Sequence, residues 1–432
     1  MKQPSVSSYY AATASPYEAY APLQGRQEAR VAVVGGGYAG LNTALGLAER
    51  GVRDVVLLER ERVGFGASGR NGGFVFAGYS LGEQALLDQL GETRARALFG
   101  LTTAAVERIR ARIARYAIAC DAVDEGVIWA NWFRDPEVLR RRQQLLSEHY
   151  GVGWDWLPQE QLRERVRSPR YSDGLYEHNA LHLHPLNYAI GLAAAAAGQG
   201  VRVHEQSEVR RLKREGSRWL LGTAQGELLA EQVVLACGGY LADLYKPIDR
   251  AVLPIATYVM ATEPLGERLD ECLATRAAVY DSRFAFDYYR PLPDKRLLWG
   301  GRISIRNRSP QAVQRLLRHD LAQVFPQLKG AKIEYAWSGL MSYARHQMPQ
   351  LGRGEGDDAG LWWAQAFGGH GLAPTCALGE LLAAAIAEGD DGWRQFADYG
   401  LASTHKPFGL LAAQLNYWWQ QARDGLKTRL EG

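Results

Sequence analysis

One short stretch, VAVVGGGYAG at Val31–Gly40, organises the whole chain. Its four small apolar residues predict a buried strand, and the glycines after them predict a tight turn into a helix. Gly35 permits the turn, Gly37 lets a diphosphate approach the backbone, and Gly40 lets the helix pack on the strand. The free N–H groups and partial positive charge at the start of that helix favour an anion there.

A second apolar run, Val55–Leu58, follows and ends at Glu59. A carboxylate at this point can accept two hydrogen bonds from a ribose and would repel a 2′-phosphate. Strand, glycine turn, helix, strand and acidic residue therefore occur in the order of a Rossmann-like unit. We expect an α/β fold whose first domain binds an adenine dinucleotide.

Composition excludes several classes of protein. The chain has 432 residues, enough for two domains, with 47% hydrophobic and 22% charged residues, as in ordinary globular proteins. A net charge of +3 gives no reason to expect nucleic acid. The four cysteines form no metal-binding pattern and are read as reduced thiols. The sequence shows neither a signal peptide nor a bilayer-spanning apolar run, so we expect a cytoplasmic protein.

The pattern of strands suggests how the chain is divided. Short apolar strands of the dinucleotide-binding type return near residues 201–204, 233–236 and 361–366, whereas longer, aromatic-rich strands begin near residue 251. We expect these to form an antiparallel or mixed sheet in a second domain. The predicted division is an N-terminal arm laid over the surface at 1–27, a discontinuous dinucleotide-binding domain at 28–110, 187–250 and 355–400, a substrate domain at 111–186 and 251–354, and a C-terminal helix at 401–432.

Two further glycine-rich segments carry chemistry. Residues 62–73 contain five glycines among small polar residues, so several backbone N–H groups could approach a large flat ligand. Gly368–Gly371 lies between a predicted strand and a predicted helix, so the segment has the same strand, glycine turn and helix order as Val31–Gly40. The start of that second helix could hold negative charge on a reduced ring.

Other patterns leave alternatives open. Tyr258, Phe286, Tyr288 and Tyr289 could line a pocket from the second sheet, or they could be core. The arginines at 140–142 are interpreted as a solvated helix face. His178, His182 and His184 could converge on a metal, but hydrogen bonding at strand ends is the preferred interpretation because no carboxylate or cysteine accompanies them.

These motifs, taken together, resemble the D-amino-acid oxidase and sarcosine oxidase superfamily of flavoproteins over nearly the whole chain. The resemblance rests on VAVVGGGYAG, the segment 64–73, the strand ending at Gly238-Gly239, and Gly368–Gly371. Finer marks look like the γ-glutamylputrescine oxidase branch, and bacterial L-pipecolate oxidases are a related possibility. These marks lie at 8–11, 66–73, 182–187, 325–330 and 348–350.

By that resemblance the cofactor is FAD, and it is noncovalent, because sarcosine oxidases attach the ring through a cysteine in the segment corresponding to 338–349, where this chain has none. Gly369, His370 and Gly371 would lie near the pyrimidine side of the ring, and Val209 beside the adenine. The residues expected to bind FAD are Gly35, Gly37, Tyr38, Ala39, Gly40, Glu59, Arg60, Ala67, Ser68, Gly69, Arg70, Asn71, Gly72, Gly73, Val209, Cys237, Gly238, Gly368, Gly369, His370 and Gly371.

Arg302 ends a strand on which sarcosine oxidases carry a lysine, and its planar fork suits a carboxylate. With Arg345 and with Tyr258 or Tyr343, it is the predicted clamp for a substrate carboxylate, and His370 completes the predicted catalytic set. The alternative for Arg302 is an ion pair with a neighbouring acid.

The resemblance implies oxidation of a C–N bond, with hydride transfer from a neutral amine to flavin and then to dioxygen or another acceptor. The leading substrate prediction is a cyclic secondary amino acid such as L-pipecolate, and the alternative is γ-glutamylputrescine. A reading from another class is a non-redox or tRNA-modifying FAD module, which would call for a basic groove.

The aromatic C-terminal segment with Arg423, Lys427 and Arg429 predicts a helix. We expect it to pack on the protein itself or on another subunit, and peripheral contact with the inner face of a membrane is the alternative.

Overall fold

The VAVV run ends a central strand, as predicted. In the computed structural model, which describes residues 7–431, β1 (Gly25–Val34) lies between β2 (Val55–Leu58) and β11 (Gly226–Leu235), parallel to both. The first sheet has the order β17-β18-β11-β1-β2-β8, and a meander extends it from β11. Its other strands are β8 (Arg202–His204), β9 (Arg211–Glu215), β10 (Arg218–Gly222), β17 (Gln350–Arg353) and β18 (Leu361–Gln365).

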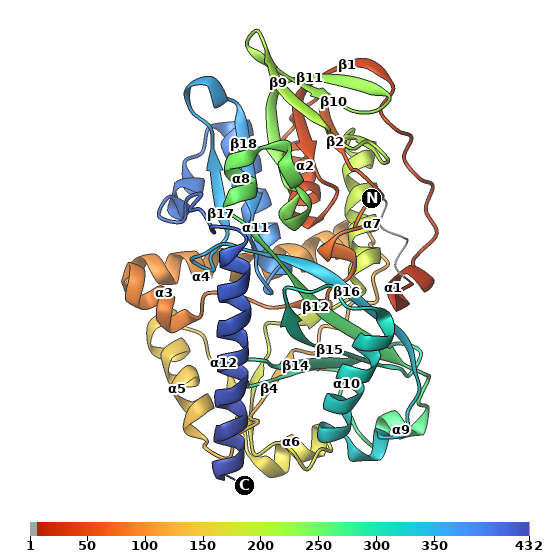
Figure 1. The fold of residues 1–432 in the computed structure, drawn as a ribbon, viewed down its shortest axis with the longest axis vertical. Coiled ribbons are helices and arrows are strands. Elements are labelled where there is room, and N and C mark those ends of the chain that lie inside the picture. The colour runs from red at the N-terminus through yellow and green to blue at the C-terminus, as the bar shows by residue number, and fades with distance from the viewer. Residues whose placement is uncertain (1–6, 432) are drawn as a thin grey trace.

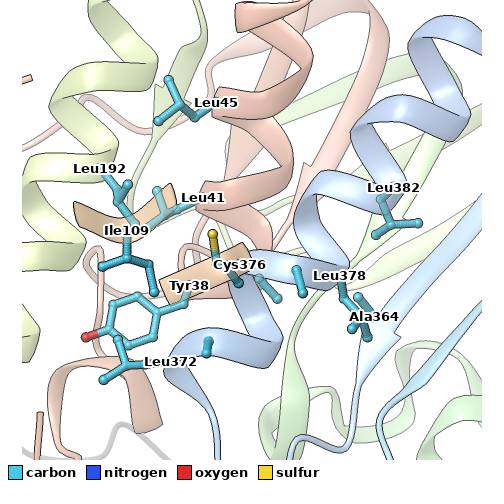
Figure 2. Close-up of a cluster of buried hydrophobic side chains, with 14 of the residues drawn as sticks. Tyr38, Leu41, Leu45, Ile109, Leu192, Ala364, Leu372, Cys376, Leu378 and Leu382 are labelled. Atoms are coloured by element: carbon cyan, nitrogen blue, oxygen red, sulfur yellow. The ribbon is translucent and has the colours of Figure 1, made fainter. Parts of the chain in front are cut away.

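Small and branched apolar residues pack the helices that cover this sheet. Figure 2 shows part of that core, in which Leu41 and Leu45, Ile109, Leu192 and Leu378 come together from four helices. The helices of this half are α2 (Tyr38–Glu49), α3 (Glu83–Leu90), α4 (Glu92–Arg115), α7 (Pro185–Gly198) and α11 (Leu372–Glu388). They bury one face of the parallel strands.

The second sheet, drawn in the lower half of Figure 1, has the order β16-β12-β15-β14-β13-β4-β6-β5 and is mostly antiparallel. Its strands are β4 (Val127–Ala130), β5 (Asp155–Leu157), β6 (Gly174–Glu177), β12 (Leu253–Thr262), β13 (Ala278–Asp281), β14 (Asp287–Pro291), β15 (Leu297–Ser304) and β16 (Ile333–Tyr343). A third, two-stranded sheet joins β3 (Phe74–Val75) to β7 (Leu181–His182). The prediction of a Rossmann-like domain with a second, mixed-sheet domain is confirmed.

The remaining helices are short, except for one of 15 and one of 24 residues. They are α1 (Tyr9–Ala12), α5 (Glu137–Leu145), α6 (Gln159–Arg165), α8 (Lys246–Arg250), α9 (Glu267–Asp270), α10 (Pro310–Val324) and α12 (Phe408–Glu431), with single turns at Ala67–Gly69, Leu146–Tyr150, Gly238–Tyr240, Ala242–Leu244, Pro326–Leu328, Gly356–Asp358 and Gly392–Phe396. No helix within residues 7–431 combines the length and apolarity that crossing a bilayer requires.

Two predictions about the division of the chain are corrected by the structure. The N-terminal arm does not merely lie over the surface, because Tyr9 and Tyr10 are buried among residues of the second sheet, beside Trp337. β17 lies in the segment assigned to the substrate domain, yet it pairs with β18 in the first sheet.

The predicted C-terminal helix is present as α12, which runs beside the second sheet in Figure 1. Its inner face packs on the protein, as expected: Gln414 Oε1 accepts from the Ile305 backbone N–H, and Asp424 Oδ2 accepts from the Phe284 N–H. Its outer face is apolar and exposed.

Candidate active site

One cavity of about 1510 Å³ lies between the two large sheets. A single small-molecule pocket usually occupies about 300–1000 Å³, so this cavity can hold a large cofactor and a substrate together. Its walls include the first glycine turn, the glycine-rich segment 64–73, the turn 368–371, and aromatic residues of the second sheet. The three glycine segments, far apart in sequence, therefore meet in one place.

The first turn is shaped for close approach. Gly35 has a φ of +113°, and a Cβ atom on it would lie 2.7 Å from the Ala236 carbonyl oxygen. A Cβ on Gly40 would lie 2.0 Å from the Gly35 oxygen, which explains why the helix can pack so tightly here. Glu59 closes the turn, because its Oε2 accepts from the Gly36 N–H at 2.7 Å. Burial raises the pKa of Glu59, although hydrogen bonds from backbone N–H groups oppose that shift.

The segment 64–73 is a fixed loop. The Asn71 side chain donates to the Ala67 and Ser68 carbonyls, and its Oδ1 accepts from the Gly73 N–H at 2.8 Å. From the second domain, the Arg290 Nε donates to Gly72 O at 2.7 Å. A Cβ on Gly72 would lie 2.5 Å from the Tyr288 ring. This loop is therefore held in one conformation where it lines the cavity.

The turn 368–371 faces the same cavity. Gly368 has a φ of +61°, and the Gly369 N–H donates to Ser80 Oγ at 3.1 Å. His370 Nε2 lies 3.1 Å from Phe76 O, so Nε2 carries the hydrogen and Nδ1 can accept. Burial lowers the pKa of His370 to about 4, and the imidazole is therefore neutral at pH 7.

These features fit an FAD molecule. Gly37, at the start of α2, has no side chain to cap the helix, and Ser68 Oγ accepts from the Tyr38 N–H at 2.9 Å instead. A Cβ on Gly37 would lie 3.0 Å from that oxygen, so the absence of a side chain at Gly37 keeps the cradle open. Among the cysteines, all of which lie in the described part of the chain, only Cys237 lines the cavity, next to the first turn. The segment 338–349 has no cysteine to attach the ring.

Most predicted site residues line this cavity. They are Gly35, Gly37, Tyr38, Ala39, Glu59, Arg60, Ala67, Ser68, Arg70, Asn71, Gly72, Val209, Cys237, Gly238, Arg302, Tyr343, Arg345, Gly368, Gly369, His370 and Gly371. Gly40, Gly69 and Gly73 lie behind the wall and support it. A Cβ on Gly69 or Gly73 would lie 2.3 or 2.1 Å from a backbone oxygen.

Tyr258 is not part of the cavity, and neither is Tyr289. Successive side chains of a strand point to opposite faces, so Thr257 and Tyr288 line the cavity while Tyr258 and Tyr289 pack in the core against α10. The Tyr258 hydroxyl donates to Arg306 O at 2.6 Å. Phe286 lines the cavity as predicted. Tyr258 is thus removed from the predicted carboxylate clamp.

Arg302 lines the cavity but is already paired. Its Nε and Nη2 contact the two carboxylate oxygens of Asp320 at 2.8 and 2.6 Å. Burial lowers the pKa of Arg302, but the Asp320 carboxylate outweighs burial and the net shift is upward. The alternative that the sequence left open, an ion pair with a neighbouring acid, is the arrangement observed.

The interpretation of the arginines at 140–142 as a solvated helix face is wrong for Arg142. Arg140 and Arg141 are exposed, but Arg142 lines the cavity and pairs with Glu83, with Nη2 2.7 Å from Oε1. Its guanidinium lies 4.3 Å from the centre of the Trp129 ring. The sequence analysis missed Arg142, Glu83 and Tyr280 because no local pattern sets them apart. They lie on α5, α3 and β13, and only the packing of these three elements brings them together.

Two of the three histidines, His182 and His184, make buried hydrogen bonds, as the preferred interpretation expects, whereas the exposed His178 pairs with Asp155 at 2.6 Å. His182 Nε2 contacts Arg276 O at 2.7 Å, and His184 accepts from the Asn187 N–H at the start of α7. Burial lowers their pKa values to about 3 and about 4. No group of three metal-binding side chains occurs among residues 7–431.

Comparison with known proteins gives a consistent result. The family model described as DAO, FAD dependent oxidoreductase, matches residues 30–385. The γ-glutamylputrescine oxidoreductase of Escherichia coli K12 is 37% identical over 404 residues, 93% of each chain. A probable oxidoreductase, OrdL, of Haemophilus influenzae is 34% identical over 90% of each. In fold, glycine oxidase of Geobacillus kaustophilus is similar, with a TM-score of 0.71 at 24% identity, over 87% of this chain and 99% of that one.

Proposed function

Because this chain belongs to the DAO family of FAD-dependent oxidoreductases, we propose that it oxidises γ-glutamylputrescine at the carbon that bears the terminal amine. The family assignment confirms FAD as the cofactor and an enzyme that acts on C–N bonds of amines or amino acids. The absence of a cysteine from the segment 338–349 supports noncovalent binding of FAD. The same assignment argues against the alternative that the protein is a non-redox or tRNA-modifying FAD module. The observation that carries the substrate proposal is 37% identity over 93% of both chains with an enzyme of that name.

The cavity supports the same choice over L-pipecolate, the leading prediction from sequence. That prediction relied on Arg302 as a clamp for a carboxylate beside the reacting amine, and Arg302 is held by both oxygens of Asp320. A γ-glutamyl amine carries no carboxylate next to its reacting carbon, so it needs no clamp at that position.

The walls of the cavity explain what the chain contributes to the reaction. When bound, the flavin accepts a hydride from the carbon next to nitrogen. Phe76, Tyr280 and Tyr288 supply apolar surface that removes water from an aliphatic amine and orients it. His370, neutral at pH 7, adds no positive charge that would repel the amine.

The direct test is turnover of the purified enzyme with γ-glutamylputrescine, putrescine and L-pipecolate, followed by product formation and by loss of the oxidised flavin absorbance. We expect the highest kcat/KM with γ-glutamylputrescine. A higher kcat/KM with L-pipecolate would return Arg302 to the role of clamp and refute the proposal.

We propose also that the outer face of α12 contacts a membrane surface. Seven large apolar side chains on this helix are exposed, including Phe408, Trp418, Trp419 and Leu430, and Arg423 and Arg429 on the same face suit anionic headgroups. Flotation with anionic vesicles should capture the wild type and lose a Trp418→Ser/Trp419→Ser variant. Equal recovery of both would contradict membrane contact, and a mass that doubles in the wild type alone would assign the face to a second copy.

A further inference from the structure

An ion pair and a tyrosine lie together in the cavity wall, outside the glycine segments. Arg142 and Glu83 are paired at 2.7 Å, and both line the cavity, as does Tyr280. The Tyr280 ring stacks on Trp129 and on Phe76, with centroids 5.9 and 5.6 Å apart. Arg142 lies over Trp129 as well, so one set of aromatic rings fixes both polar groups.

Several polar atoms of this cluster lack partners. Within residues 7–431, the Tyr280 hydroxyl, the Arg142 Nε and the Glu177 Oε2 are buried without a hydrogen bond. Tyr280 is 7% exposed and Glu177 is 4% exposed. Buried polar groups are nearly always paired, and a buried ion pair that serves stability needs its remaining hydrogen bonds satisfied. Tyr280 and Arg142 line the cavity, whereas Glu177 does not, and unused hydrogen-bonding capacity on these two side chains at the cavity wall points to a ligand.

The charges of the cluster balance. Burial lowers the pKa of Arg142, but the Glu83 carboxylate outweighs burial, the net shift is upward, and the side chain stays charged. Burial raises the pKa of Glu177 to about 8, so this carboxyl is protonated near pH 7. One cation and one anion, side by side, remain to face the cavity.

We propose that Arg142, Glu83 and Tyr280 form a subsite for the zwitterionic α-amino-acid head of the γ-glutamyl group, at the end of the substrate remote from the flavin. Arg142 and the Tyr280 hydroxyl would hold the α-carboxylate, and Glu83 would hold the α-ammonium. This subsite rests on the proposed function, because only a substrate with an amino-acid head far from the reacting amine uses it.

The position of the cluster fits that arrangement. A Cβ on Gly78 would lie 3.4 Å from Glu83 Oε1 and 3.5 Å from His370 Cε1, so Gly78 separates the ion pair from the turn expected beside the flavin. Phe76 contacts His370 on one side, at 4.2 Å between ring centroids, and Tyr280 on the other. An apolar methylene chain and amide can lie along these rings between the two ends.

The experiment compares three substrates that differ only in the head. Glutarylputrescine lacks the α-ammonium, and 4-aminobutyrylputrescine lacks the α-carboxylate. With wild-type enzyme, we expect kcat/KM to fall about 10- to 100-fold for each, mainly through KM, since each loses a charged hydrogen bond. Equal kcat/KM for all three would overturn the subsite while leaving the proposed function intact. Absence of turnover with all three substrates would overturn both the subsite and the proposed function.

Variants then assign each partner. Arg142→Gln should lower kcat/KM for γ-glutamylputrescine about 10- to 100-fold. It should change kcat/KM for 4-aminobutyrylputrescine by less than about 2-fold, because that substrate has no carboxylate for Arg142 to bind. Glu83→Gln should likewise leave kcat/KM for glutarylputrescine nearly unchanged, because that substrate has no ammonium. Tyr280→Phe should change kcat/KM for the three substrates in the same pattern as Arg142→Gln. Equal losses on all substrates would show a structural role and refute the assignment.

Two controls separate loss of the subsite from general damage to the protein. Arg141→Gln, on the next residue of the same helix with an 81% exposed side chain, should match the wild type. Flavin content reports folding of each variant. If Arg142→Gln does not fold, Tyr280→Phe and the wild-type comparison still decide, since neither disturbs the ion pair.

Discussion

Arg302 and Asp320 form a bidentate ion pair in which the Arg302 Nε and Nη2 lie 2.8 and 2.6 Å from the Asp320 carboxylate oxygens. The Asp320 side chain is fully buried, and that of Arg302 is 18% exposed. The pair joins β15 to α10 at the wall of the cavity, which Arg302 lines. It converts the arginine that the sequence offered as a substrate clamp into part of the scaffold of the second domain.

Asp320→Ala is therefore expected to destabilise the protein strongly. Removing one partner leaves the other charge buried and unpaired, which costs about 3–5 kcal/mol. Chemical denaturation of the holoenzyme measures the change. Asp270→Ala, which breaks the exposed pair with Lys295, should cost no more than about 1 kcal/mol. Equal effects of the two substitutions would contradict the structural role of Asp320.

Gly35→Ala should reduce FAD binding. The new Cβ would lie 2.7 Å from the Ala236 oxygen at a φ of +113°, and strain of this kind costs about 1–3 kcal/mol. If that strain distorts the turn, the affinity for FAD falls about 10- to 100-fold. Flavin retained per protein chain after desalting measures the loss. Gly82→Ala is the matched control, because a Cβ there meets nothing within 4 Å and φ is −62°. Full flavin content in Gly35→Ala would refute the expected role of the turn.

Glu177→Gln should change how stability depends on pH. Burial raises the pKa of Glu177 to about 8, above its value of about 4.3 in an unfolded chain. The folded state therefore binds the proton more tightly, and this residue's contribution to stability is lost as pH rises from about 4 to 8. The variant lacks that loss, so its Tm relative to the wild type should be higher at pH 8.5 than at pH 5.

Thermal unfolding at both pH values, with Glu160→Gln on the exposed side of α6 as control, checks this expectation. A Tm difference between Glu177→Gln and wild type that is the same at pH 5 and pH 8.5 would contradict the raised pKa. The control should show no such pH dependence.

Local signals were enough to predict the first domain. The turn at Gly35–Gly40 needs glycine for backbone reasons, so its role is visible in a short window, and the strand and helix beside it follow. The glycines at 72–73 and 368–371 are also local, and the structure brings both segments to the same cavity.

The substrate end could not be predicted in this way, because it depends on register and on distant packing. Tyr258 and Thr257 are neighbours, and only the pairing of β12 with β15 and β16 determines which one faces the cavity. Arg142 looks like its exposed neighbour Arg141 until β4 places Trp129 beneath it. Asp320 lies 18 residues beyond Arg302 on a helix, where nothing local marks it as a partner.

The central claim is that the cavity holds FAD with a γ-glutamylated amine beside it, and anaerobic mixing of the purified holoenzyme with γ-glutamylputrescine tests it most directly. The account predicts rapid and complete loss of the oxidised flavin absorbance with this substrate, and much slower loss with putrescine or L-pipecolate. Flavin that stays oxidised with γ-glutamylputrescine but is reduced by L-pipecolate, or by no amine at all, would contradict it.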